Sequence, residues 1–212
     1  MFIVKGNKKK EMSEQEFESL SKNFGSVVLD IGTGDGKFVY KNASKDKNTL
    51  FIGIDPVERQ LRTFSKKSNR KRLENTLFVL GSADTIPSEL FSCIDKIIII
   101  LPWGTLLEKV IKGDREFLED LNRLLKVSGG IEIYLGYSPE LEPSETKRLE
   151  LPPINEDFIH ENIVPQYSPY FSLEVLEKMN KKNLDEVGSS WAKKLKHGND
   201  RDIFKMVFRK KA

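Results

Sequence analysis

Val-Val-Leu-Asp-Ile-Gly-Thr-Gly-Asp-Gly, residues 27–36, joins a continuous apolar run to three glycines spaced two positions apart. The apolar run Val27–Ile31 predicts a buried strand. The glycines predict a sharp turn at which the backbone can approach a ligand without Cβ atoms in the way, and a helix is expected next. Ligands of open α/β sheets bind at this carboxyl edge of the strands, so the stretch predicts both a parallel sheet and the location of its binding site.

Four more short apolar segments predict the neighbouring strands, at residues 49–55, 76–81, 95–101 and 131–137. Amphipathic segments between or before them predict helices. One opens with the capping box Ser13–Glu16 and ends near Phe24, a basic one covers 57–73, and one is capped by Asp114. Short apolar strands that alternate with amphipathic helices are typical of βαβ units and of a mainly parallel sheet covered on both faces.

The two ends of the chain predict additions to this core. Residues 1–25 predict a hairpin and a helix, and the proline-rich residues 138–170 predict an insertion between strands five and six, with a helix around 142–150. A helix is expected over about 172–182. The tail after it predicts two final strands, joined by a basic, tryptophan-containing connection at 189–201. Since no repeat or low-complexity linker interrupts the chain, we expect residues 1–212 to form one domain.

Composition limits the class of protein. The 212 residues are 38% hydrophobic and 32% charged, with a formal net charge of +3, which suits a water-soluble globular protein. The single cysteine, Cys93, cannot form an internal disulfide, and with only two histidines no metal cluster is expected. The N-terminus does not resemble a signal peptide and no apolar run approaches the roughly 20 residues of a membrane helix. We therefore expect a cytoplasmic protein, and a monomer.

Positive residues are clustered although the net charge is small. A charge run is usually a solvated helix face, but several runs on one surface would form a phosphate-binding face. The clusters are Lys8–Lys10, Lys66–Lys67, Arg70–Arg72, Lys147–Arg148, the three lysines 193, 194 and 196, and Arg209–Lys211.

The glycine turn favours S-adenosylmethionine over a dinucleotide. Lys37 stands where a dinucleotide-binding turn has its third glycine, and Asp30 would repel a pyrophosphate but suits a ligand with a sulfonium and an amino group. Asp55 is placed to accept both ribose hydroxyls. Asp84 is placed to accept the adenine amino group, with the N–H of Ala83 beside it. The alternative is that Asp55 and Asp84 are ordinary turn residues at strand ends.

Two tryptophans follow or flank the expected ligand edge. Trp103 comes directly after the fourth strand, between Pro102 and Gly104, and Trp191 lies in a polar, basic stretch. Two such rings suit a flipped nucleobase, for which stacking contributes about 1–3 kcal/mol per base. The alternative for each is packing in the core. No carboxylate or histidine near Trp103 serves as a base to deprotonate guanine N1, whereas adenine N1 has a free lone pair; this narrows the choice of base without selecting one.

The combination DIGTGDGK, FIGIDPV, LPWGTLLEKVIK and SSWAKKLKHG, in this order over nearly the whole chain, resembles the Kam/Npm-type aminoglycoside-resistance enzymes, which are 16S rRNA (adenine 1408, N1)-methyltransferases. The resemblance implies a class I S-adenosylmethionine-dependent methyltransferase fold. This is a Rossmann-like α/β fold with a seven-stranded, mostly parallel sheet, an N-terminal hairpin and inserted loops. It implies the assembled 30S subunit as the substrate, recognised at the decoding-site helix of 16S rRNA, and resistance to kanamycin- and apramycin-like drugs.

Functional residues follow from the same resemblance and from the motifs. Trp103 and Trp191 would stack on the flipped adenine, with Ser189 hydrogen bonding nearby and the Pro102 carbonyl at the amino group. The cofactor-binding residues would be Asp30, Gly32, Gly34, Asp55, Pro56, Ala83, Asp84, Leu101 and Thr105. The rRNA-binding residues would be Lys66, Lys67, Arg70, Lys71, Lys147, Arg148, Lys194 and Arg201. Two positions depart from the family pattern: Asn199 stands where an arginine is expected, and Asp84 where a glutamate is common.

Three other functions remain open from the sequence. A tRNA guanine-N7 methyltransferase shares the fold and also attacks a free lone pair, but it should lack the tryptophan pair. A small-molecule methyltransferase would not need the basic clusters. A non-catalytic ribosome-binding factor could retain the cofactor fold without transferring a methyl group.

Overall fold

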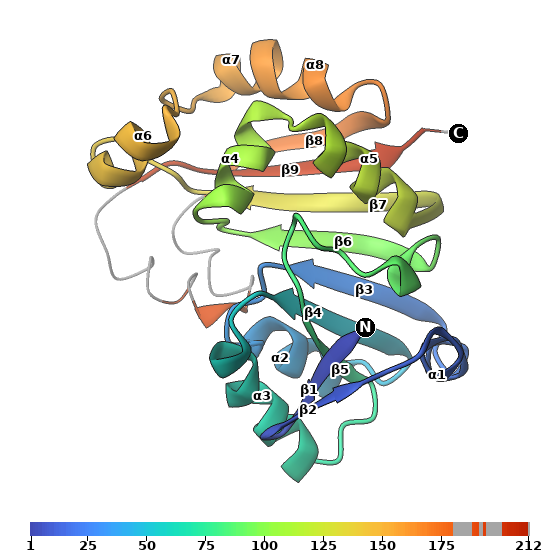
Figure 1. The fold of residues 1–212 in the computed structure, drawn as a ribbon. Coiled ribbons are helices and arrows are strands. Elements are labelled where there is room, and N and C mark those ends of the chain that lie inside the picture. The colour runs from blue at the N-terminus through green and yellow to red at the C-terminus, as the bar shows by residue number, and fades with distance from the viewer. Residues whose placement is uncertain (180–187, 191–192, 194–200, 212) are drawn as a thin grey trace.

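The computed structural model describes residues 1–179, 188–190, 193 and 201–211, and a mixed nine-stranded sheet forms its centre (Figure 1). The strand order is β2-β1-β5-β4-β3-β6-β7-β9-β8. The strands are β1 (Phe2–Lys5), β2 (Lys8–Glu11), β3 (Ser26–Ile31), β4 (Thr49–Asp55), β5 (Thr76–Leu80), β6 (Ile94–Ile100), β7 (Leu125–Leu135), β8 (Phe171–Met179) and β9 (Ile203–Lys210). The α/β class and the five strands expected over 27–137 are confirmed, although β7 begins earlier than expected.

The parallel part of the sheet positions the ligand edge. β3 pairs in parallel with β4 on one side and with β6 on the other, so that Asp30 lies opposite both Gly53 and Ile98. The chain order reverses between β3 and β6, and a switch point of this kind opens a crevice at the carboxyl ends of the two strands. The glycine turn after β3 and the Pro102–Gly104 turn after β6 both lie at this crevice.

Helices cover the sheet in two groups (Figure 1). Around β3–β5 lie α2 (Lys37–Lys45) and α3 (Glu58–Arg70), and around β6–β9 lie α4 (Thr105–Lys112) and α5 (Arg115–Leu124). Successive residues of a strand point to opposite faces, so a strand that is buried on both faces contributes to two cores. In β4, Phe51 packs with Leu61 and Phe64 of α3, whereas Ile52 belongs to the main core with Leu121 of α5.

The N-terminal hairpin joins the sheet, which therefore has nine strands: the seven expected and the two of the hairpin. β1 pairs antiparallel with β2, and Ile3 pairs with Val79 of β5. Ser65 of α3 fixes the hairpin, because its buried Oγ donates to the carbonyl of Val4 at 2.8 Å and accepts from the N–H of Gly6 at 2.7 Å. The helix α1 (Glu14–Ser21) follows the hairpin, with the predicted Ser13–Glu16 capping box in place.

The helix expected over 172–182 is wrong, because residues 171–179 form the strand β8. β8 pairs antiparallel with β9, and its register shifts between Leu173 and Val175. The extra residue, Glu174, lets Leu173 and Leu176 pack against the same core although they are three positions apart, and this spacing imitates a helix. β9 is one of the two strands expected in the tail; the stretch expected to form the other, from Leu184, is mostly outside the described residues.

Residues 138–170 lie between β7 and β8, where an insertion was expected. They carry α6 (Pro143–Leu149), which confirms the helix predicted around 142–150, and a continuous helical stretch of α7 (Glu156–Phe158), η2 (Ile159–Ile163) and α8 (Val164–Tyr167). The buried Tyr167 donates its hydroxyl to the carbonyl of Val110 in α4 at 3.2 Å, so the insertion is packed against the core. Where the chain is described, no helix combines the length and the apolar character needed to cross a membrane.

The single cysteine is half-buried beside the short helix η1 (Ser88–Leu90). The Cys93 thiol donates to the carbonyl of Leu90 at 3.0 Å. Burial raises the pKa of this thiol to about 11, and the neighbouring Lys126 opposes the shift only in part. Cys93 therefore remains protonated at neutral pH. The described residues contain no group of histidines, cysteines and carboxylates that could hold a metal ion.

Candidate functional site

The turn after β3 is shaped by its glycines and by Asp55. Gly32, Gly34 and Gly36 have φ angles of 75°, 60° and 79°, a region that side chains with a Cβ rarely adopt. The carboxylate of Asp55 at the end of β4 accepts from the N–H of Gly34 at 2.9 Å and from the N–H of Val57 at 2.8 Å. Asp55 thus holds the glycine turn and the entry to α3 together, a role that the sequence analysis missed. Each oxygen retains acceptor capacity for a ribose hydroxyl.

Asp30 is the most unusual carboxyl group of the site. It is 2% exposed, and its Oδ2 accepts from the hydroxyl of Thr33 at 2.5 Å. Its Oδ1 is buried without a hydrogen-bond partner in the described chain. Burial raises the pKa of Asp30 to about 7, opposed by the Thr33 hydrogen bond and assisted by the charges of Asp55 and Asp35. A buried acceptor without a partner is costly, so the site is complementary to a cationic donor.

A cavity of about 180 Å³ opens beside Asp30. The glycine turn and the segment 189–190 both line it, together with Gln60 of α3 and Ile100 of β6. The hydroxyl of Ser190 donates to Oδ2 of Asp35 at 2.7 Å, which joins two segments that are 155 positions apart. Ser189, expected near the target base, is therefore placed at the cofactor side as well. Gln60, Ile100 and Ser190 carried no signal in the sequence, and Asp35 could have been noticed only as part of the glycine turn.

These residues fit S-adenosylmethionine. The buried, unpartnered oxygen of Asp30 matches a positively charged amino group or sulfonium, and the turn presents backbone rather than side chains to the ligand. A Cβ built on Gly32 would lie 2.7 Å from Cδ2 of Leu106, which would have to shift, and the φ of 75° disfavours any residue with a Cβ at this position. Asp30, Gly32, Gly34 and Asp55 are brought together as predicted, whereas Pro56 is exposed just beyond them.

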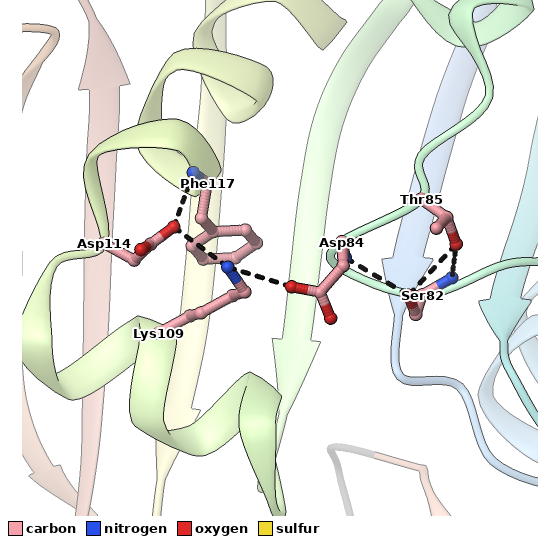
Figure 2. Close-up of polar contacts among 6 residues, drawn as sticks. All are labelled: Ser82, Asp84, Thr85, Lys109, Asp114 and Phe117. Atoms are coloured by element: carbon pink, nitrogen blue, oxygen red, sulfur yellow. Dashed lines mark hydrogen bonds and ion pairs between the residues drawn. The ribbon is translucent and has the colours of Figure 1, made fainter.

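The expected adenine side of the site contains an ion pair that was not predicted. Asp84 is half exposed, and its carboxylate pairs with Nζ of Lys109 in α4 at 3.0 Å; the same ammonium group pairs with Asp114 at 3.0 Å (Figure 2). Ser82 and Thr85 hydrogen bond to one another within the loop, as Figure 2 also shows. Asp84 therefore ties the loop after β5 to the cap of α5. Ala83 beside it is buried.

The turn after β6 has two backbone positions in the left-handed region. Leu101 has φ 51° and donates its N–H to the carbonyl of Tyr134 at 2.8 Å, and Gly104 has φ 61°. Between them, Pro102 is buried and Trp103 is 49% exposed. The alternative that Trp103 is a core residue is therefore wrong. Thr105 begins α4 and is exposed. Trp191, the predicted second ring, lies outside the described residues.

A second cavity, of about 210 Å³, lies beside Trp103. Pro102, Trp103 and Tyr137 line it together with Glu142 and Arg201. Arg201 donates from Nη1 to Oε1 of Glu142 at 2.6 Å and to the carbonyl of Gly136 at 2.9 Å, and its side chain is only 11% exposed. Arg201 was expected to bind rRNA; the structure places it, mostly buried, in the wall of this cavity, and its contact with rRNA stays a prediction. Glu142, which holds Arg201, was missed because nothing in the sequence pairs positions 59 residues apart. Its place beside Trp103 also corrects the expectation that no carboxylate lies near this tryptophan, although the ion pair with Arg201 engages it.

The remaining predicted rRNA-binding residues are on the surface where the chain is described. On α3, Lys66 and Arg70 are exposed and Lys67 is half-buried, and Lys71, which directly follows the helix, is exposed. On α6, Lys147 and Arg148 are exposed, and Lys194 lies outside the described residues. Arg148 pairs with Glu145 at 2.6 Å. A Cβ on Gly104 would lie 3.8 Å from Nη2 of Arg148, so α6 reaches the Trp103 turn.

Comparisons with known proteins agree with this geometry. The family model for NpmA, described as 16S rRNA (adenine(1408)-N(1))-methyltransferase, matches residues 2–209. The Escherichia coli protein of the same description is 36% identical over 212 residues, with 97% of each chain covered. Two solved structures match the full length of both chains: a 30S ribosomal adenine-1408 methyltransferase from an uncultured bacterium (35% identity, TM-score 0.80) and an aminoglycoside resistance methyltransferase (30% identity, TM-score 0.83).

The tRNA guanine-N7 methyltransferases, one of the alternatives left open by the sequence, are less similar to this chain. A tRNA (guanine-N(7)-)-methyltransferase of Campylobacter jejuni subsp. doylei is 27% identical, but the match covers 55% of this chain and 30% of that protein. The similarity therefore covers only part of each protein.

Proposed function

The chain belongs to the NpmA family of 16S rRNA (adenine(1408)-N(1))-methyltransferases, and from that premise we propose that it transfers the methyl group of S-adenosylmethionine to N1 of adenine 1408 in the 30S ribosomal subunit. The observation that carries the proposal is the juxtaposition at the β3–β6 switch point. A buried carboxylate, with one oxygen that has no hydrogen-bond partner among the described residues, lines one cavity there, and a half-exposed tryptophan lines the next.

The chemistry needs little from the protein beyond placement. Adenine N1 has a free lone pair, so methyl transfer forms an N–C bond while the S–C bond breaks, and no proton has to be removed first. S-adenosylmethionine supplies the electrophilic carbon when bound. The protein's contribution is to hold the two reactants in line at contact distance, an effect worth several kcal/mol of barrier, about 7–11 in the best intramolecular cases.

We assign the residues as follows. Asp30 pairs with the cationic part of the cofactor, the glycine turn accommodates its backbone, and Asp55 accepts from the ribose hydroxyls. Trp103 stacks on the extruded adenine, with Trp191 as the second ring and the carbonyl of Pro102 as acceptor for the exocyclic amino group. The flipped base costs a few kcal/mol of lost stacking, and the rings offset this cost at about 1–3 kcal/mol per base.

The basic residues of α3 and α6 serve as the docking surface for 16S rRNA around the decoding-site helix. Phosphate contacts by lysine and arginine supply affinity and register without reading the sequence. We further propose that residues 1–212 act as one domain and as a monomer in the cytoplasm, where the 30S subunit is found.

The product explains the consequence for the cell. A methyl group on N1 adds bulk and a positive charge to the Watson–Crick edge of the adenine. An aminoglycoside ring that binds this edge would meet both a steric and an electrostatic obstacle, so we propose that the activity confers aminoglycoside resistance.

Reverse transcription across the decoding site tests the proposal. Purified 30S subunits are incubated with the protein and S-adenosylmethionine, and primer extension is expected to stop at adenine 1408, because N1-methyladenine cannot pair. A tRNA guanine-N7 enzyme would instead yield 7-methylguanosine on tRNA and no stop on 16S rRNA. A binding factor without activity would transfer no label from methyl-labelled cofactor. Either result would refute the assignment.

A further inference from the structure

Helix α2 begins with a lysine, although the helix dipole disfavours a positive charge at this end. Lys37 is the first residue of α2, and the N-terminus of a helix is the positive end of its dipole. No acidic residue lies in the first turn, and the residue one turn further, Lys41, repeats the charge. Like charges four positions apart destabilise a helix. Lys45, in the last turn, shows the placement that the dipole favours.

Other positive charges converge on the same point. The pKa of Lys37 is lowered, by burial first and then by the charges of Lys41, Lys193 and Lys67, with Asp35 opposing them in part. These lysines come from α2, from α3 and from the segment that follows Ser190. Within the described chain, none of them forms an ion pair with a carboxylate. The structure thus gathers these positive charges near the start of α2, where Asp35 offsets them only in part.

Two aromatic rings restrain Lys67 of this group and Lys71, which directly follows α3. The rings of Tyr40 in α2 and Phe64 in α3 lie 5.2 Å apart. The ammonium group of Lys67 lies 4.0 Å from the centroid of Phe64, and that of Lys71 lies 5.3 Å from the centroid of Tyr40. Cation–π contacts restrict these side chains before any partner arrives, which reduces the entropy lost on binding.

We propose that Lys37 and Lys41 extend the rRNA-binding surface of α3 onto α2, as far as the rim of the cofactor cavity, and bind backbone phosphates next to the target nucleotide. A polyanion would neutralise the repulsion that the free protein retains, and proteins depart from local preferences mainly at functional sites. The position suits this role, because Lys37 directly follows the glycine turn, and Ser189 and Ser190 near Lys193 line the same cavity. The inference rests on the proposed function.

The test compares Lys37→Gln and Lys41→Gln with Lys45→Gln, which removes the same charge from the exposed far end of the same helix. Affinity for 30S subunits is measured by competition at several salt concentrations, S-adenosylmethionine affinity by calorimetry, and stability by thermal unfolding. Each of the first two variants is expected to bind 30S roughly fivefold more weakly and to lower the salt slope by about one. Their cofactor affinity should be unchanged and their melting temperature equal or higher. Lys45→Gln should bind 30S as the wild type does.

The other outcomes distinguish a failure of the inference from a failure of the proposed function. If 30S affinity and salt slope match the wild type while the wild type still methylates adenine 1408, the inference is refuted and the proposed function stands. If Lys37→Gln instead weakens cofactor binding and leaves 30S binding intact, the anion that Lys37 binds is the carboxylate of the cofactor, and the inference is also refuted. If the wild type itself leaves adenine 1408 unmodified, the proposed function has failed independently of these variants.

Discussion

Asp30 shows how one buried carboxyl group can link folding, pH and cofactor binding. Its pKa is raised to about 7 by burial, whereas an unfolded aspartate titrates near the model value of 3.8. The folded protein therefore holds a proton that the unfolded chain has lost, and the group's contribution to stability falls as pH rises from about 4 through 7. A cation bound at Oδ1 would lower the pKa of Asp30 again, because it favours the ionised form of the carboxyl group.

We predict that S-adenosylmethionine binds more tightly at pH 8 than at pH 6, with proton release on binding near pH 7. Calorimetry in buffers of different ionisation enthalpy measures both quantities. Asp30→Asn should lose most of the affinity and its pH dependence. The free variant should be more stable than the wild type at pH 8, by about 1–4 kcal/mol. An Asp30→Asn protein with wild-type affinity would remove Asp30 from the cofactor site.

Trp103 is exposed enough that its substitution should affect catalysis without disturbing the core. Because Trp103 is half exposed, the substitution Trp103→Ala should change the melting temperature little and leave cofactor affinity within about twofold. Methyl transfer to 30S should fall by about 100-fold or more, which corresponds to a loss of roughly 3 kcal/mol in transition-state stabilisation. Trp103→Phe should recover part of the rate. Primer extension and calorimetry on the same preparations decide the matter, and normal modification by Trp103→Ala would contradict the stacking role.

The sequence predicted the residues whose role depends on local context and missed those that depend on distant partners. Asp30 and the glycines follow from the turn after one strand, and Trp103 follows from the end of another. Arg201 looked like a surface cation because its partner Glu142 is far away in the chain. Asp84 was expected to bind the cofactor, which stays a prediction, and its ion pair with Lys109 could not be foreseen because only the fold brings the two together.

At the scale of elements, the N-terminal hairpin depends on Ser65. Ser65→Ala would leave the buried N–H of Gly6 and the carbonyl of Val4 without their partner, so we expect a loss of about 2–3 kcal/mol in the free energy of unfolding. Ser68 is the matched control, since it lies on the same helix and its buried hydroxyl has no partner in the described chain. Ser68→Ala should be neutral or stabilising. Denaturant unfolding measures both, and equal losses would contradict the account.

The strand β8 explains where element prediction failed. The alternation that identifies a strand is interrupted at Glu174, so Leu173 and Leu176 repeat with the period of a helix. A bulge cannot be told from a helical turn in one sequence, because only the partner strand β9 defines the register. The parallel strands that end in glycine turns had no such ambiguity. The N-terminal hairpin was predicted correctly, but its pairing with β5 was not.

At the scale of the whole molecule, cofactor binding should stabilise the entire described fold. The site is built from β3, β4, α3 and β6, and between them these elements contribute to all three apolar clusters of the described chain. A ligand that binds only the folded state at 100 times its dissociation constant adds about 2.7 kcal/mol. We therefore expect S-adenosylmethionine at that concentration to raise the melting temperature by about 5–11 °C. Under the same conditions the Asp30→Asn variant should show almost no rise; a full rise in that variant would indicate a different binding site.

The state of Cys93 has a practical consequence. Because burial raises the pKa of Cys93 to about 11, its thiol is almost entirely protonated at pH 7, and maleimide reagents should react with it far more slowly than with an exposed cysteine. The chain is thus a ready-made background for site-specific labelling. A fluorophore on Ser144→Cys, an exposed position of α6 beside the tryptophan turn, would follow the arrival of a ribosomal subunit in real time without a prior cysteine knockout.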